Sequence, residues 1–340
     1  MTGKDFSYFK PGEGLLMKRT RAAAVLCLVL CCLGMAACPA GVPKTYPLRL
    51  GTFSDQREHG VTDLFIYSPW SPGQYAQLTL PEHCWGVTLP NTSHDSKAPV
   101  SSPWRISGDS TAAVFEKNPR DGVTFRATAA CDSMAVKLRI EIENQSADAV
   151  KDIRALVCLK PDNTIGNPGR GDCMRAFRDT SYALTYFPSG GRQIQLHQDT
   201  HYSGEYPPGI TPENIRTKIV WGINVKGCPD IRSIEDVGWW YIGDHPGRVV
   251  EEQADPALIA IQARGDSTRW LATIWDPPRV LFANPLNPCF HSDPSFADCP
   301  PGGKTSAEGI VFFHDGTFAQ LVERALAWKA ALHSAKESGK

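Results

Sequence analysis

The residues best suited to chemistry lie between two cysteines, in the stretch CFHSDPSFADC that runs from Cys289 to Cys299. This stretch carries an imidazole, His291, and a carboxylate, Asp293, two residues apart. A histidine beside a carboxylate is a common pair for general acid–base catalysis. His291 and Asp293 are therefore candidate catalytic residues, and His291 is also a candidate ligand-binding residue.

A second group of such side chains lies in the stretch GWWYIGDH. Three large aromatic residues, Trp239, Trp240 and Tyr241, precede Asp244 and His245. Aromatic faces can stack on a sugar ring, and the polar neighbours can bind its hydroxyls, so the three aromatic residues are candidate ligand-binding residues. His245 and Asp244 form a second candidate acid–base pair. Alternation along a strand would instead place at least one of the aromatic rings in a core.

Two asparagines, Asn284 and Asn287, precede the first stretch and are further candidate ligand-binding residues. The alternative is that Asn287-Pro288 and Asp293-Pro294 only form turns, because these side chains hydrogen-bond the local backbone. The sequence leaves both interpretations open. In either case the four prolines around the stretch predict a loop.

The N-terminal segment has the layout of an export signal. Residues 17–38 read MKRTRAAAVLCLVLCCLGMAAC, with a short basic region, an apolar core and small residues before Cys38. The last four resemble a bacterial lipobox, which predicts lipidation at Cys38; Met35 departs from the usual leucine, so ordinary cleavage stays open. We expect residues 1–38 to be a leader, with Met1 or Met17 as the start, and the mature protein to lie in the bacterial cell envelope, facing the periplasm or the outer surface.

Export decides how the remaining cysteines are interpreted, because oxidising compartments favour disulfides. Close spacing favours the pairs Cys289–Cys299 and Cys158–Cys173. Free buried thiols are one alternative, and a zinc site using Cys289, His291 and Cys299 is another. Such a site also needs a fourth ligand and reduced thiols. We therefore expect a loop stapled at Cys289 and Cys299, and neither a metal nor a cofactor.

Composition excludes several classes of function. A net charge of -1 without a basic patch argues against a nucleic-acid partner. The P-loop, the dinucleotide fingerprint, the G-x-S-x-G elbow and the H-E-x-x-H motif are missing from the sequence. No reaction is therefore named by a motif.

The elements that must position these residues are mostly strands, because period-two alternation recurs along the chain. In AVKLRIEIE, residues 135–143, Val136, Leu138, Ile140 and Ile142 would face one side. A polar turn follows, and residues 150–160 return as a more apolar strand, so the two predict a long hairpin. Further strands are predicted at residues 75–80, 113–116, 123–127, 182–187, 193–197, 218–225, 257–263, 270–274 and 309–313.

A single helix is predicted at about residues 317–336. Thr317 and Gln320 have the spacing of a capping box, and apolar residues recur along one face at three- and four-residue steps. We expect this face to dock on the sheets. The predicted fold is an all-β, large antiparallel β-sandwich with a C-terminal helix, in one domain over residues 39–340.

The predicted hairpin resembles the central hairpin of galactose-mutarotase-like supersandwich domains, over about 30 residues. The turn Glu143-Asn144-Gln145-Ser146 matches the "N-x-S/T" turn of that family. Active mutarotases carry a catalytic histidine on the return strand, whereas here the strand has Cys158 and no histidine. The resemblance implies a sugar-facing concave sheet and leaves epimerase chemistry unsupported.

Two hypotheses follow. In the first, an exported and lipid-anchored protein binds or processes carbohydrate between residues 239–245 and 284–293. In the second, the protein is a non-catalytic structural or protein-interaction domain at the cell envelope. They differ in whether the two segments converge on one face.

Overall fold

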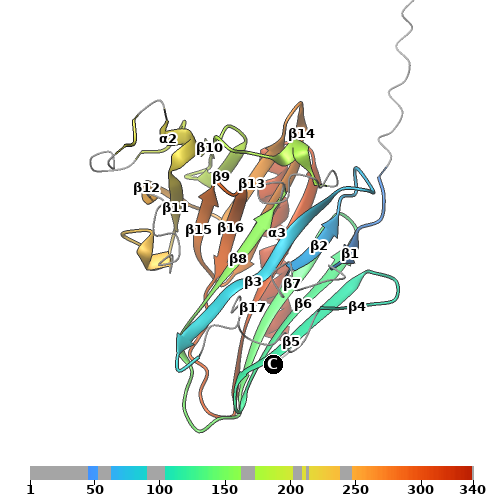
Figure 1. Cartoon of the computed structure of the whole chain (residues 1–340), viewed down its shortest axis with the longest axis vertical. Coiled ribbons are helices and arrows are strands. Elements are labelled where there is room, and N and C mark those ends of the chain that lie inside the picture. Colours follow the sequence, from blue (N-terminus) through green and yellow to red (C-terminus); the bar gives the residue numbers. More distant parts are fainter. Residues whose placement is uncertain are drawn as a thin grey trace, which may run out of the picture. The chain divides into compact units, whose positions relative to one another are not determined.

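Two β-sheets packed face to face form the main body of the computed structural model (Figure 1). The structure describes residues 45–52, 63–89, 104–161, 173–201, 209–211, 214–237 and 247–338. Residues from Thr45 to Lys340 belong to one compact unit. Among the helices so described, none is both long and apolar enough to cross a membrane.

The first sheet has eight strands, and all its neighbouring strands are antiparallel except β11 and β12. In spatial order they are β1 (Arg49–Gly51), β2 (Asp63–Tyr67), β3 (Tyr75–Val87), β8 (Lys151–Lys160), β16 (Cys289–Pro294), β15 (Pro278–Asn284), β11 (Val220–Val225) and β12 (Gly247–Ala254).

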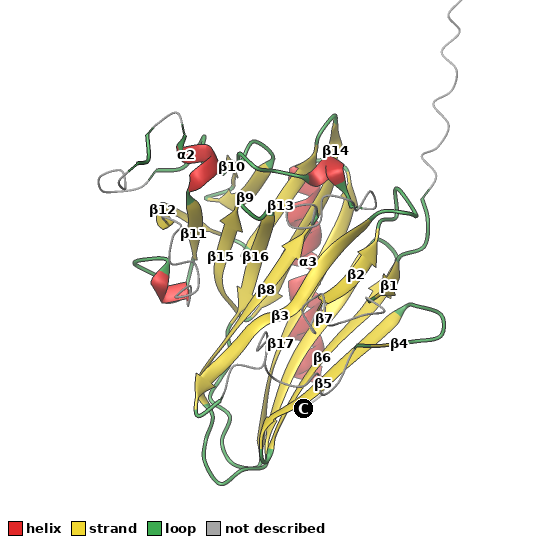
Figure 2. Ribbon diagram, in the orientation of Figure 1, coloured by secondary structure: helices red, strands yellow, loops and turns green. Residues whose placement is uncertain are grey.

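The second sheet has nine strands and is antiparallel throughout. In spatial order they are β10 (Arg192–Gln195), β9 (Thr185–Ser189), β13 (Leu258–Ala263), β14 (Asp266–Asp276), β17 (Gly303–Asp315), β7 (Ala135–Asn144), β6 (Val123–Asp132), β5 (Ala112–Arg120) and β4 (Arg105–Ile106). Figure 2 shows both sheets in yellow.

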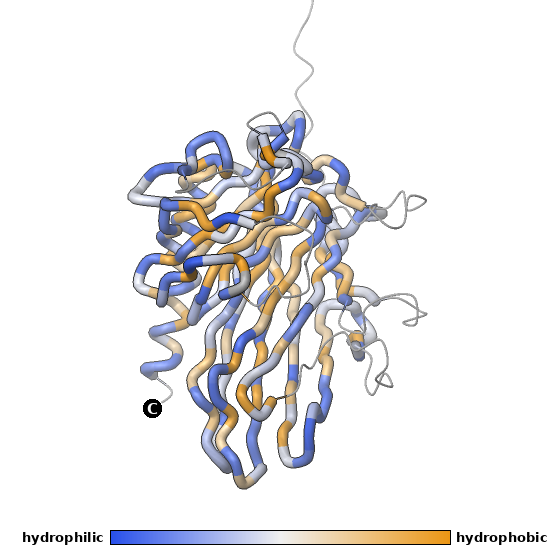
Figure 3. The backbone as a smooth tube through the Cα atoms, turned by 60° about the vertical axis from the view of Figure 1, so that its left-hand side comes forward, coloured by the Kyte–Doolittle hydropathy of each residue, from blue (hydrophilic) through white to orange (hydrophobic). Residues whose placement is uncertain are grey.

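The core between the sheets follows from alternation along the strands. On β7, Val136, Leu138, Ile140 and Ile142 are buried in the shared core, as their spacing predicts. On β8 the inward residues are Ala155, Val157 and Leu159. Apolar residues accordingly gather along the strands in Figure 3. The prediction of an all-β sandwich with a C-terminal helix is confirmed.

The predicted hairpin of residues 135–143 and 150–160 is wrong, although both strands exist. β7 lies between β6 and β17 in the nine-stranded sheet, whereas β8 lies between β3 and β16 in the eight-stranded sheet. The turn between them therefore carries the chain from one sheet to the other. Asn144 stabilises this crossing, because its buried amide donates to the carbonyls of Asp148 and Cys299 at 2.8 and 3.0 Å.

The C-terminal helix α3 (Phe318–Ser338) covers the outer side of the nine-stranded sheet (Figure 2). Its first turn has the predicted capping box, in which the Gln320 N–H donates to Thr317 Oγ1 at 3.2 Å and the Thr317 N–H donates to Gln320 Oε1 at 2.8 Å. Phe318, Leu321 and Ala325 are buried against residues of β13, β14 and β17. Three short helical turns complete the described elements: η2 (Arg175–Phe177), α2 (Ile215–Lys218) and η3 (Glu235–Val237).

Candidate functional site

The outer face of the eight-stranded sheet carries a row of buried polar residues. Strand register aligns Asp63, Thr79, Cys158 and His291 across β2, β3, β8 and β16. The Thr79 hydroxyl donates to Asp63 Oδ1 at 2.7 Å. All four side chains point away from the core between the sheets and are nevertheless at most 6% exposed. Buried polar groups are costly unless they find partners, so this face is the first candidate for a site.

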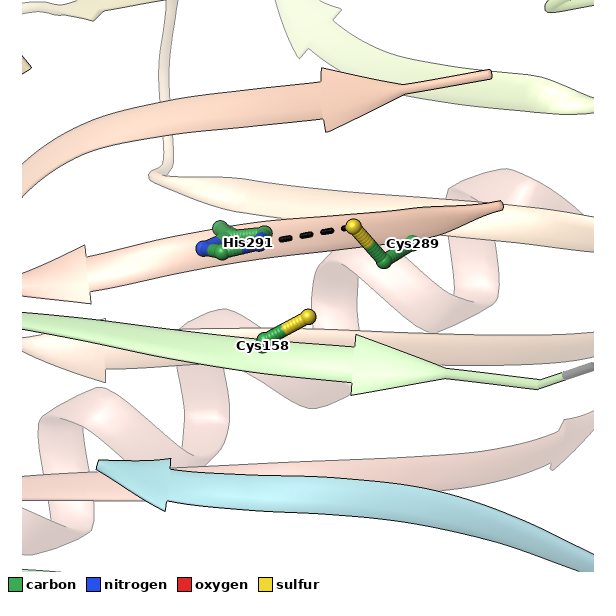
Figure 4. Close-up of side chains that lie close together, drawn as sticks. All are labelled: Cys158, Cys289 and His291. Atoms are coloured by element: carbon green, nitrogen blue, oxygen red, sulfur yellow. Dashed lines mark hydrogen bonds between the residues drawn. The ribbon is translucent and has the colours of Figure 1, made fainter. Parts of the chain in front are cut away.

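Cys158 and His291, at one end of this row, form a cluster with Cys289 (Figure 4). Cys289 and His291 are two residues apart on β16 and share a face, and Cys158 lies opposite His291 on β8. Their two Sγ atoms and one imidazole nitrogen all lie within 4.8 Å of one another. Cys289 Sγ lies 3.6 Å from His291 Nε2.

Carboxylates flank the histidine on both sides. Asp293 Oδ1 lies 3.4 Å from Nδ1 of His291 and accepts the Val157 N–H at 2.8 Å. Glu82 Oε2 lies 3.8 Å from Nε2 of His291. Burial by itself would lower the pKa of His291, but the nearby Cys158 and Asp293 outweigh it and raise the pKa.

Burial also affects the pKa values of Cys158 and Lys160 on this face. Burial, with the neighbouring Cys289 adding to it, raises the pKa of the Cys158 thiol well above its usual range. Burial alone would lower the pKa of Lys160, but Cys158 and Glu82 outweigh it and raise the pKa. Thiol, imidazole and carboxylate are also the components of a cysteine nucleophile with its base, but such a nucleophile has a lowered thiol pKa, whereas the pKa of Cys158 is raised. Because Cys158 is 0% and Cys289 5% exposed, the thiols do not reach a substrate from solvent in this conformation.

An open cavity of about 530 Å³ lies at the edge of the sheet where β8 and β15 begin and β16 ends. Three arginines and three aspartates line it, together with one aromatic ring. The lining residues are Asp152, Ile153, Arg154, Pro229, Asp230, Ile231, Arg232, Asp236, Pro278, Arg279, Ser295 and Phe296.

Arg279 is the residue that connects this cavity to the buried row. Its Nη2 donates to the Asp236 carbonyl at 2.5 Å, while its Nη1 is buried and has no hydrogen-bond partner within the described ranges. Burial and the nearby Arg154 lower the pKa of Arg279, whereas Asp293 acts in the opposite direction. A buried donor without a partner is expensive, so Nη1 is available to a ligand oxygen or a water.

Neither predicted disulfide forms among the described residues, because Cys158, Cys289 and Cys299 are not bonded to another cysteine. Cys289 lies beside the end of β8 and Cys299 bridges Val150, just before its start. The ten residues of β8 at about 3.3 Å each separate the two cysteines by roughly 30 Å. A disulfide spans only about 7 Å between Cα atoms.

The second predicted pair, Cys158–Cys173, fails for the same reason. Cys158 lies opposite Thr79 and Cys173 opposite Tyr75, four residues away along β3. That spacing corresponds to about 13 Å. The stretch that begins at Cys289 is also not a stapled loop, since Cys289–Pro294 is strand β16, next to the centre of the sheet.

The other predicted ligand-binding residues divide into two groups. Asn284 shares the outer face with His291, but its Oδ1 accepts the N–H groups of Leu286 and Asn287 at 2.9 and 3.4 Å and so shapes the turn before β16. Trp239, Trp240 and Tyr241 lie outside the described residues, as do Asp244, His245 and the predicted lipidation site, Cys38.

Sequence reasoning missed Glu82, Lys160 and Cys158 as members of the site. One signal was present: in CFHSDP, Cys289, His291 and Asp293 alternate, so a strand would place all three on one face. Nothing in the sequence indicated that Cys158 of β8 joins them, because the register of β8 against β16 depends on the whole fold. The return strand lacks a histidine, and the neighbouring strand places His291 directly opposite Cys158.

Comparisons with known proteins give fold likeness only. No protein-family profile matches the sequence, and a search of curated proteins found no match. The fold is similar to a candidate aldose 1-epimerase from Escherichia coli K12, with a TM-score of 0.39 and 9% identity over 75% of this chain and 96% of that one.

Two further solved structures are similar. The galactose mutarotase related enzyme from Lactobacillus acidophilus matches with a TM-score of 0.35 and 8% identity, over 75% of this chain and 91% of that one. A polysaccharide lyase matches with a TM-score of 0.32 and 11% identity, over 80% of this chain and 33% of that one. The expected likeness to galactose-mutarotase-like domains is thus found as a likeness of fold. At such low scores and identities, activity has to be argued from this chain's own residues.

Proposed function

We propose that the protein binds a carbohydrate in the open cavity where β8 and β15 begin and β16 ends. One observation carries this proposal: the cavity combines guanidinium donors and carboxylate acceptors with one aromatic side chain, Phe296, and includes the unpartnered Arg279 Nη1. A sugar hydroxyl both donates and accepts, so a lining of mixed donors and acceptors suits a hydroxyl-rich ligand better than an apolar one.

Binding is favoured over processing. Of the predicted acid–base pairs, His291 and Asp293 are both 0% exposed, and so lack the access that proton transfer to a bound sugar requires. We propose that both residues support the sheet instead. The proposal places the protein outside the bacterial inner membrane, held by a lipid on Cys38, as the signal-like segment predicts.

The experiment is a glycan-array screen of the protein followed by calorimetry with any glycan that binds. Arg279→Ala and Arg232→Ala should each weaken binding about 10- to 100-fold, because hydrogen bonds to a charged group contribute about 1.5–3 kcal/mol. Arg126→Ala is the matched control, since this exposed arginine lies on β6 of the other sheet and should bind as the parent does.

Trp240→Ala tests the predicted aromatic platform in the same assay. Loss of binding in Trp240→Ala alone, with Arg279→Ala unaffected, would move the site to the aromatic segment. A folded protein that binds no glycan would refute the proposal and favour the interaction domain.

A further inference from the structure

The Cys158, Cys289 and His291 cluster has the composition and spacing of a zinc site. Thiolate sulfur and imidazole nitrogen are the donors that Zn²⁺ prefers in proteins. Here two sulfurs and one nitrogen converge within 4.8 Å from two adjacent strands (Figure 4). No turn chemistry or capping explains why three such groups meet on a sheet face.

The one specific distance within the cluster agrees with tetrahedral coordination. With Zn–S near 2.3 Å and Zn–N near 2.0 Å, a tetrahedral ion holds sulfur and nitrogen roughly 3.5 Å apart. The distance from Cys289 Sγ to His291 Nε2 is 3.6 Å. Cys289 and His291 are therefore already spaced to share a tetrahedral ion.

The groups around the cluster complete such a site. Glu82 lies outside the group of donors within 4.8 Å of one another, but its Oε2 is 3.8 Å from His291 Nε2, is buried and has no hydrogen-bond partner in the described part of the chain, which makes it a candidate for the fourth ligand. On the far side of the imidazole, Nδ1 faces Asp293 Oδ1 at 3.4 Å. A carboxylate behind a metal-bound histidine is the common way to hold its tautomer and ring orientation.

We propose that Cys158, Cys289, His291 and Glu82 bind one Zn²⁺ ion as a closed, structural site. Continuous backbone pairing between β8 and β16 covers only Phe290 with Leu159 and His291 with Cys158, and it resumes at Arg154 with Ser295 just after β16. A bound ion would tie the two strands together beside this short ladder. This site is separate from the cavity of the proposed function, and neither proposal depends on the other.

The test is metal binding by the full chain, purified under reducing conditions and freed of metal with a chelator. Titration with Zn²⁺ should bind one ion per chain and raise the midpoint of thermal unfolding. Titration with Co²⁺ should give the intense visible and near-ultraviolet bands of tetrahedral thiolate coordination.

Metal binding by single variants distinguishes the proposed ligands from other buried residues. Cys158→Ser and Cys289→Ser should lose the Co²⁺–thiolate bands and bind Zn²⁺ at least about 100-fold more weakly, whereas Glu82→Gln should keep the bands and bind about tenfold more weakly. Cys299→Ser is the matched control: its buried sulfur lies far along β8 and contacts the Ile142 carbonyl, so metal binding should be unchanged.

Three outcomes would overturn the proposal. They are no stoichiometric Zn²⁺ binding by the reduced, folded chain; binding that survives in Cys158→Ser and Cys289→Ser; and a Cys158–Cys289 disulfide that forms in the protein as isolated and persists in place of metal. Thiol counting by mass spectrometry before reduction detects the last. Glycan binding in Cys289→Ser, measured in parallel, distinguishes failure of this site from failure of the cavity.

Discussion

Replacing Asp293 with alanine should lower the free energy of unfolding by about 2 kcal/mol. Asp293 is 0% exposed, and its Oδ1 accepts the buried N–H of Val157 at 2.8 Å. Pairing between β8 and β16 is interrupted after Cys158 and His291 and resumes at Arg154 and Ser295, so the carboxylate takes the place that a backbone carbonyl would have in an unbroken ladder.

The expected change in the free energy of unfolding is the difference between two costs and one gain. Losing a hydrogen bond to a charged group costs about 1.5–3 kcal/mol, and the abandoned Val157 N–H adds a further penalty of about 1–3 kcal/mol. Removing a buried carboxylate, whose Oδ2 lacks a hydrogen-bond partner among the described residues, returns part of that cost. We therefore expect a net loss of about 2 kcal/mol for Asp293→Ala.

Asp293→Asn is the matched variant, because it keeps an acceptor oxygen and the volume of the side chain while removing the charge. It should lose only about 1 kcal/mol, the difference between a charged and a neutral hydrogen bond. The assay is urea unfolding followed by tryptophan fluorescence, with midpoint and slope compared among the three proteins. The reasoning is refuted if Asp293→Ala unfolds within about 0.5 kcal/mol of the parent, or if Asp293→Asn is the less stable of the two.

The remaining predictions concern the nine-stranded sheet and its helix. Gly309→Ala should cost about 1–3 kcal/mol in the same urea assay, because a Cβ would lie 2.4 Å from the ring of Trp275, and normal stability of that variant would contradict the packing. Thr317→Ala should lower the free energy of unfolding by about 1 kcal/mol, because it removes the cap of α3, and its thermal midpoint should be lower. Thr317→Ser keeps the hydroxyl and should retain most of the stability of the parent. Burial would raise the pKa of Asp276, but the 2.9 Å bond from His333 and two nearby lysines outweigh it and lower the pKa. The lowered pKa means that ionised Asp276 stabilises the fold. This contribution is present above the unfolded pKa of about 3.9 and is lost as the pH falls through the lower folded pKa. Asp276→Asn should therefore lose less unfolding free energy on acidification than the parent.

Most of the strands could be predicted because each is encoded locally. The residues of β7 alternate between apolar and charged, which is enough to predict a strand with one buried face. The helix α3 could be predicted for the same reason, since its cap and its apolar face lie within one segment. These features need no knowledge of the rest of the chain.

The pairing of strands could not be predicted, because it depends on contacts far apart in sequence. β7 and β8 follow one another closely, and nothing local shows that the turn after Asn144 leads into a different sheet. Pro288 and Pro294 suggested a loop, yet they bracket β16 at its two ends, where a missing N–H is tolerated. The disulfide predictions were wrong for the same reason, because cysteines that are close in sequence lie far apart along β8.

The composition of the central strands contains the information about the site that sequence reasoning did not use. β8 and β16 are buried on both faces, so each polar side chain on their outer faces carries a desolvation cost that an apolar residue would avoid. Cys158, His291 and Asp293 all fall at such positions and all face the same side. Groups of this kind are stabilised only by what they bind, whether another side chain, an ion or a ligand. Polar residues in a strand that is buried on both faces therefore locate this site, together with the register that aligns them. They do so better than the prolines and the cysteine spacing of the segment.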